Sequence, residues 1–172
     1  TVETIYAPGH ATFVEPGGVA LPWEGERRPG HFRGVATVVL KLFQLVQPDA
    51  AYFGQKDYQQ SLVVRRMVAD LDVPVEIRVC PIVREPDGLA LSSRNVYLSP
   101  AERREALALS RGLRQARARF ESGERRADVL RAALWAELAA SPGVAVEYAE
   151  VVDAETLEPL ELLDRPAVAL VA

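Results

Sequence analysis

The sequence has few of the residues that build disulfides, metal sites and membrane spans. A single cysteine, Cys80, excludes an internal disulfide and a cysteine-based zinc site. The two histidines, His10 and His31, stand too far apart for a local His-x-x-x-His pair, and we expect no protein-held metal. No apolar run approaches the roughly 20 residues that span a bilayer, and no charged-then-apolar signal segment is present. We therefore expect a cytoplasmic protein without a membrane partner.

Positive charge is in slight deficit, and almost all of it is arginine. The chain carries 20 basic and 24 acidic side chains, and 49% of its 172 residues are hydrophobic. This composition is typical of a folded globular protein and provides no general attraction for nucleic acid. Only Lys41 and Lys56 are lysines. Any anion must therefore be bound by a local cluster of side chains.

Helical and strand patterns alternate in the first half of the chain. Residues 1–30 are predicted to form a loop with one short strand near Ala11–Val14. The patterns then predict a helix over Val35–Val46 and a buried strand over Ala50–Phe53 that ends at Gly54. A second helix from Asp57, with Val64, Met67, Val68 and Leu71 inward, precedes a strand over Val75–Val83. This order predicts a Rossmann-like parallel α/β sheet, of which this is the later part. In such sheets ligands bind beyond the carboxyl ends of the strands.

The second half reads as a smaller α+β unit. Ser99-Pro100-Ala101-Glu102 predicts a capping box at the start of a helix that runs to about Ser122, with Ala106, Leu109, Leu113 and Phe120 inward. A second helix over Asp128–Ala140 and strands over Val144–Val152 and Ala167–Val171 follow. In the last strand of the first half, Cys80 is predicted to be buried. We expect two domains, residues 1–83 and 84–172.

The turn after the first strand is a candidate phosphate site. Gly54 lets a ligand approach the backbone, the following helix start offers free N–H groups, and Lys56 adds a mobile positive charge. Asp57 and Gln60 also satisfy a capping box, so a purely structural role for these two residues stays open.

Two further clusters are candidates. Ser92, Ser93 and Arg94 can donate several hydrogen bonds to one polyphosphate, although such residues are common in ordinary loops. No adjacent histidine and acid make either serine a nucleophile, which argues against a hydrolase. Arg28 and His31 belong to a local basic patch over residues 27–33, and neither a P-loop nor a dinucleotide fingerprint occurs.

Four strings in this order resemble the pantothenate synthetase (pantoate–β-alanine ligase) family. They are RPGHFRGV at residues 28–35, YFGQKDYQQ at 52–60, PIVRE at 81–85 and DGLALSSRN at 87–95. The resemblance implies a nucleotidyltransferase domain followed by a small lid. It also implies ATP- and Mg²⁺-dependent condensation of pantoate with β-alanine through a pantoyl-adenylate, releasing AMP and pyrophosphate, by a homodimer.

The resemblance also implies residue roles. Gly54, Gln55 and Asp57 would bind ATP around its ribose, Lys56 would reach the phosphates, and Val83 would lie by the adenine. Leu91, Ser92, Ser93 and Arg94 correspond to the family's flexible phosphate loop, with Lys56, Ser92, Ser93 and Arg94 as the catalytic set. Gln60 would bind pantoate, and Arg28 and His31 would lie near the active site.

One departure from the family concerns its first third. The family's His-x-Gly-His motif has no match here, the chain starts at Thr1 without methionine, and it stops within the apolar run 167–172. We expect more chain on both sides and no activity from these residues alone. Two alternatives stay open: another nucleotidyltransferase-superfamily enzyme, such as a cytidylyltransferase or a class I aminoacyl-tRNA synthetase, and a non-catalytic binding or assembly module.

Overall fold

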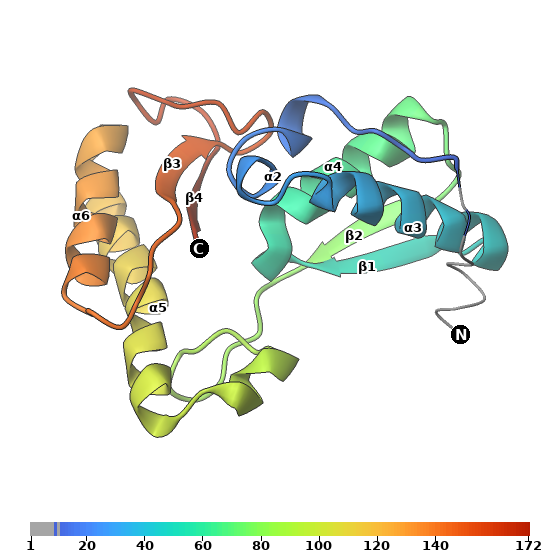
Figure 1. Cartoon of the computed structure of the whole chain (residues 1–172). Coiled ribbons are helices and arrows are strands. Elements are labelled where there is room, and N and C mark those ends of the chain that lie inside the picture. The colour runs from blue at the N-terminus through green and yellow to red at the C-terminus, as the bar shows by residue number, and fades with distance from the viewer. Residues whose placement is uncertain (1–8, 10) are drawn as a thin grey trace. The chain divides into compact units, whose positions relative to one another are not determined.

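The computed structural model describes residue 9 and residues 11–172, and the chain divides into two compact units (Figure 1). The N-terminal unit comprises residues 1–81 and the C-terminal unit residues 82–172. His10 lies outside the described residues.

Four helical segments, with the short turn η2 (Gln55–Asp57) as a fifth, build the described part of the N-terminal unit together with two strands. They are η1 (Gly18–Ala20), α2 (Glu24–Arg27), α3 (His31–Val46) and α4 (Tyr58–Asp70), and the two helices predicted before and after the first strand are confirmed. The strand predicted near Ala11–Val14 is wrong, because the Val14 N–H donates to the Thr37 hydroxyl at 2.9 Å rather than to a neighbouring strand. The predicted loop also contains η1 and α2.

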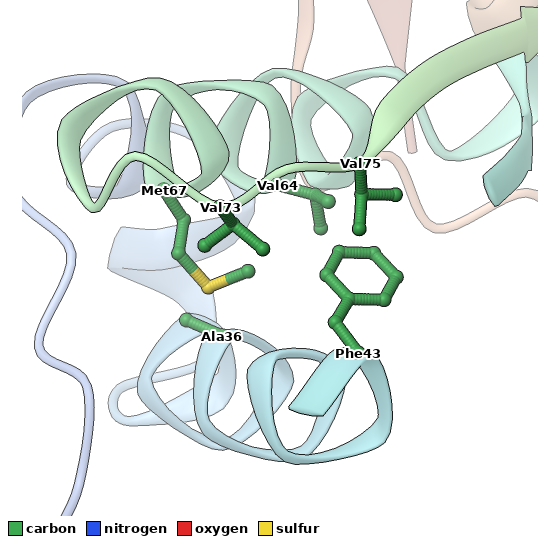
Figure 2. Packing of buried hydrophobic residues seen from close by; sticks show 6 residues of the cluster. All are labelled: Ala36, Phe43, Val64, Met67, Val73 and Val75. Carbon is green, nitrogen blue, oxygen red and sulfur yellow. The ribbon is translucent and has the colours of Figure 1, made fainter. Parts of the chain in front are cut away.

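The two strands of this unit are parallel, as the strand-helix-strand order predicts. They are β1 (Ala50–Gly54) and β2 (Glu76–Cys80), and their register pairs Ala50 with Glu76 and Gly54 with Cys80. A core forms between α3 and α4 and the following chain, shown in Figure 2 by Ala36, Phe43, Val64, Met67, Val73 and Val75. Ala51, Phe53 and Ile77 pack against this core from the sheet.

The opposite face of β1 and β2 is more exposed than the sequence predicts. Tyr52 is 65% exposed, and the Arg78 Nη1 donates to its hydroxyl at 2.9 Å. Side chains alternate between the two faces of a strand, so only one face can meet the core under α3 and α4. Cys80 is exposed, Leu71 is 50% exposed, and β2 ends at Cys80 rather than Val83. The predicted burial of Cys80 and Leu71 and the predicted end of the second strand at Val83 are therefore wrong.

The C-terminal unit packs two helices on an antiparallel strand pair. Its elements are η3 (Ser93–Tyr97), α5 (Pro100–Glu121), α6 (Ala127–Ala139), β3 (Ala149–Asp153) and β4 (Ala167–Val171). The predicted capping box is confirmed, because the Glu102 N–H donates to the Ser99 hydroxyl and the Ser99 N–H to the Glu102 carboxylate. Ala108, Ala116, Leu134 and Leu138 form the buried core with Ala149.

Two details of this unit differ from the prediction. Phe120 is 39% exposed because it sits in the last turn of α5, where the Arg125 guanidinium lies 4.2 Å from its ring centroid. The predicted strand from Val144 begins only at Ala149, although Val144 and Val146 still pack against the core. None of the helices in the described part of the chain is both long and apolar enough to cross a membrane.

Candidate functional site

The turn after β1 leads directly into the start of α4. β1 and β2 end side by side at Gly54 and Cys80, and Figure 1 shows both arrows pointing to the end of the unit where α3 begins and α4 follows. Gly54 has φ of −79°, and a Cβ placed there would meet no atom within 4 Å. Neither backbone strain nor packing therefore requires glycine here, and the space over it is open to a ligand.

Lys56 and Asp57 lie in a single 3-10 turn, η2 (Gln55–Asp57), between β1 and α4. The Lys56 ammonium donates to the Asp57 carboxylate at 3.1 Å, and both side chains are exposed. The predicted capping box is wrong: Asp57 is the N-cap of α4 but accepts no backbone hydrogen bond, because its carboxylate bonds to Lys56 instead. Gln60 is half-buried, and its side chain has no hydrogen-bond partner among the described residues.

Arg28 and His31 share one carboxylate at the start of α3. The Arg28 Nη1 donates to Glu24 Oε1 at 2.6 Å, and the His31 Nε2 lies 3.5 Å from the same oxygen. The pKa of His31 is lowered, first by partial burial and then by Arg28, while Glu24 and Asp57 oppose this shift. His31 thus lies within electrostatic reach of the Asp57 carboxylate in the turn after β1. This end of the unit offers the Arg28 guanidinium and the Lys56 ammonium close to the starts of two helices, which suits an anion.

The predicted sites of the C-terminal unit lie on and beside a hairpin of residues 83–91. The Leu91 N–H donates to the Val83 carbonyl at 2.8 Å, and Arg84 pairs with Ala90 as an antiparallel bridge. This pairing places the Val83 and Leu91 side chains, 64% and 56% exposed, on adjacent backbone. Two residues predicted to contact ATP are therefore neighbours.

The three polar residues after the hairpin have different partners. The Ser92 hydroxyl accepts the Arg94 N–H at 3.2 Å and so caps η3, which gives it a structural role. The Ser93 and Arg94 side chains are exposed and have no hydrogen-bond partner in the part of the chain that the structure describes. A hydroxyl and a guanidinium are thereby left available to one ligand, and Ser92 can still donate its O–H.

A network that sequence reasoning missed anchors this hairpin. Arg103 on α5 donates to the Asp87 carboxylate at 2.8 Å and to Glu85 at 2.6 Å, and Asn95 donates to Glu85 at 2.6 Å. Bonds from Arg103 and Asn95 hold the pKa of Glu85 below its ordinary value. The pKa of Asp87 is lowered first by the Leu89 N–H and then by Arg103. No local pattern marks this network, because the partners of Arg103 lie 16 and 18 residues away along the chain.

The predicted site residues are divided between the two units. The N-terminal unit holds Arg28, His31, Gly54, Gln55, Lys56, Asp57 and Gln60, and the C-terminal unit holds Val83, Leu91, Ser92, Ser93 and Arg94. A pocket of about 420 Å³ at the start of α6 contains none of them. Among the described residues no group of three or more His, Cys, Asp or Glu could hold a metal ion.

Comparison with known proteins decides the family. The model of the pantoate-beta-alanine ligase family matches residues 1–172, the whole chain. The chain belongs to the pantoate-beta-alanine ligase family. It is 57% identical over 171 residues to the pantothenate synthetase of Roseiflexus sp. (strain RS-1), covering 99% of this chain and 62% of that protein. The family named by the four sequence strings is thus confirmed.

Solved structures agree with the assignment to the pantoate-beta-alanine ligase family. The crystal structure of pantothenate synthetase from Thermus thermophilus matches with a TM-score of 0.95 and 50% identity over 99% of this chain and 62% of that one. A pantoate-beta-alanine ligase from Francisella tularensis, complexed with beta-gamma ATP and beta-alanine, matches with a TM-score of 0.67 and 34% identity over 86% and 53%. The predicted α/β class with a parallel sheet is confirmed. The chain spans about three fifths of the length of the curated relatives it matches.

Proposed function

We propose that this chain carries the phosphate-binding part of an ATP-dependent pantoate–β-alanine ligase. The observation that carries the proposal is the family match over residues 1–172, which includes both the Lys56 turn and the Ser93–Arg94 loop. The N-terminal unit would bind the nucleotide, and the C-terminal unit would act as its lid. The complex of the Francisella tularensis relative with beta-gamma ATP and beta-alanine supports these substrates.

The first step joins two anions, so it needs fixed positive charge. A carboxylate oxygen of pantoate attacks the α-phosphorus of ATP, the bond to the β-phosphate oxygen breaks, and pyrophosphate leaves. Lys56 and Arg94 would neutralise the phosphates, and Ser92 and Ser93 would donate hydrogen bonds to them. No protein nucleophile is required, because positioning and charge stabilisation supply the rate enhancement.

The second step forms the amide. The neutral amine of β-alanine attacks the acyl carbon of pantoyl-adenylate, the bond to AMP breaks, and the amine loses a proton. Gln60, half-buried and without a partner among the described residues, would donate to pantoate. Val83 and Leu91 would contact the base, and Gly54, Gln55 and Asp57 the ribose.

Magnesium would enter as part of the ATP complex. The exposed groups proposed around the phosphates are an ammonium, a guanidinium and hydroxyls, with Asp57 already bonded to Lys56. This donor set fits the phosphate oxygens of a magnesium nucleotide better than a cation held by protein carboxylates. By family analogy we further propose that the protein is cytoplasmic and forms a homodimer. Light scattering on the purified protein tests the homodimer.

The function is tested in the protein that contains this chain by two measurements. Pantoate-dependent ATP–pyrophosphate exchange reports the first step, and equal yields of AMP and pantothenate report the whole reaction. We expect Lys56→Met or Arg94→Met to lower the exchange rate by about a hundredfold, as for other lost transition-state donors. The matched controls Lys41→Met and Arg119→Met should retain it. Exchange that depends on an amino acid or CTP instead of pantoate would overturn the proposal.

The 172 residues alone give a separate expectation. They lack the family's His-x-Gly-His motif, so we expect them to bind ATP without forming pantothenate. Pantothenate formation by the purified chain would contradict this expectation.

A further inference from the structure

One buried glutamine ties the first turn of α4 to the segment before α3. Gln59 is 4% exposed, and its Nε2 donates to the Val19 carbonyl at 2.8 Å and to the Pro22 carbonyl at 2.7 Å. Its Oε1 accepts the Glu24 N–H at 3.2 Å. Both donors and the acceptor of one amide are used on a single stretch of backbone, which fixes residues 19–24 against α4.

That stretch is also held by backbone turn bonds and by a small apolar cluster in which Val19 and Ala20 pack against Phe32 and Val63. α2 is a single turn of four residues, too short to be stable by its own hydrogen bonds. A Cβ on Gly25 would collide with the Ala20 carbonyl, so the turn folds tightly against η1. The bonds from Gln59 add a polar link that ties the backbone of Glu24 to α4.

Glu24 in turn orients two basic side chains. Its Oε1 accepts from Arg28 Nη1 at 2.6 Å and lies 3.5 Å from His31 Nε2. Arg28 Nη1 also lies 3.3 Å from His31 Nε2, to which it donates when the imidazole is neutral and carries its proton on Nδ1. Among the described residues Glu24 engages only one end of the guanidinium, so Nη2 and Nε remain able to donate to a phosphate.

The connection starts and ends at the same turn. Gln59 follows Lys56 and Asp57 on the chain, while the Asp57 carboxylate acts electrostatically on His31. A glutamine that only filled space beneath a loop would need no bond to Glu24, whose carboxylate lies against both basic side chains.

We propose that Gln59 and Glu24 are positioning residues, which hold Arg28 and His31 at the Lys56 turn so that the two side chains together donate hydrogen bonds to the phosphates of the nucleotide. The inference rests on the proposed function, because it assigns a phosphate ligand to that same site. Neither residue touches the substrate. Their effect should grow with the number of phosphates, so ATP binding should depend on them more than AMP binding.

The test compares ATP and AMP affinity of the full chain in Glu24→Gln and Gln59→Met with two matched controls, Glu26→Gln and Gln44→Met. We expect the first pair to weaken ATP binding by about tenfold, the size of one lost charge-assisted hydrogen bond, and AMP binding by less. The controls should not change it. Unchanged ATP affinity in both variants, while Lys56→Met weakens it, would overturn the positioning role and leave the proposed function intact.

A second readout does not depend on nucleotide. The charged groups acting on His31 are Glu24, Arg28 and Asp57. Because Glu24 opposes the lowering of the His31 pKa, Glu24→Gln should lower it further in an NMR titration of the imidazole, assigned with His31→Asn. Gln59→Met should shift it in the same direction as Glu24 loses its place, and Glu24→Gln keeps the test decisive if Gln59→Met does not fold. An unmoved His31 pKa in Glu24→Gln would overturn the positioning role, whatever the ATP measurements give. Unchanged ATP affinity in Lys56→Met is a separate outcome, and it would refute the proposed function.

Discussion

The guanidinium of Arg103 on α5 donates to the carboxylate of Asp87 at 2.8 Å, and through this bond a helix holds the turn of the 83–91 hairpin. We predict that Arg103→Gln loosens the hairpin without unfolding the unit, because the bonds to Asp87 and Glu85 are lost together. Amide hydrogen exchange of Leu91, whose N–H bonds to Val83, should accelerate. Arg104→Gln is the matched control, and equal exchange in both variants would show that the bond does not hold the loop.

Acid should open the same hairpin. The pKa values of Glu85 and Asp87 lie below their ordinary values of 4.5 and 3.8 when the protein is folded. A group with a depressed folded pKa stabilises fully above its ordinary value and loses that contribution as pH falls through the folded pKa. Leu91 exchange, corrected for intrinsic rate, should therefore rise as pH drops below the ordinary pKa of 4.5 for Glu85. The rise should be smaller in Arg103→Gln, and a flat profile in the native chain would refute the linkage.

Two glycines should respond oppositely to alanine. A Cβ on Gly112 in α5 would lie 2.7 Å from Leu134 Cδ1 and 3.1 Å from its carbonyl oxygen, whereas one on Gly34 in α3 would meet nothing within 4 Å. We predict that Gly112→Ala destabilises by about 1–3 kcal/mol, as overpacking does. Gly34→Ala should stabilise by about 0.5–1 kcal/mol through the lower backbone entropy of the unfolded chain. Urea unfolding measures both, and a gain in stability for Gly112→Ala would contradict the packing at Leu134.

Loss of the α5 cap should cost less than a core change. Ser99→Ala removes the acceptor for the Glu102 N–H and should destabilise by about 1 kcal/mol. Ser122→Ala, at the other end of α5, is the control in the same urea experiment. An equal loss in both variants would mean that the capping box adds nothing particular.

Periodic features of the sequence predict the fold well. The apolar repeat over α3 and the Ser99 capping box each define a helix by local physics, because helix faces and caps are set by neighbours within one turn. Exposure is a different matter. Cys80 and Tyr52 lie in strands rich in apolar residues, and whether such a residue is buried depends on which face of the sheet the helices cover. That is a tertiary property which no local window contains.

The candidate site shows the same division. Lys56 and Arg94 could be singled out because a cationic side chain directly after a strand, or beside two hydroxyls, is a local pattern that predicts phosphate binding. Gln59 and Arg103 could not, since their partners lie 16 to 40 residues away along the chain. The Asp57 capping box failed because the adjacent Lys56 competes for the carboxylate. The contacts that position these side chains are long-range, whereas the residues proposed to bind the nucleotide stand in short local motifs.

Lys56 and Arg94 are proposed to act on the phosphates of the same ATP, and a double-mutant cycle tests this proposal most directly. ATP dissociation constants are measured for the native protein, Lys56→Met, Arg94→Met and the double variant. We predict that each single change weakens binding and that the double loss departs from the sum of the two by more than about 0.5 kcal/mol, the limit for independent sites. Losses that add within that limit, or a single variant that binds ATP as the native protein does, would contradict the account.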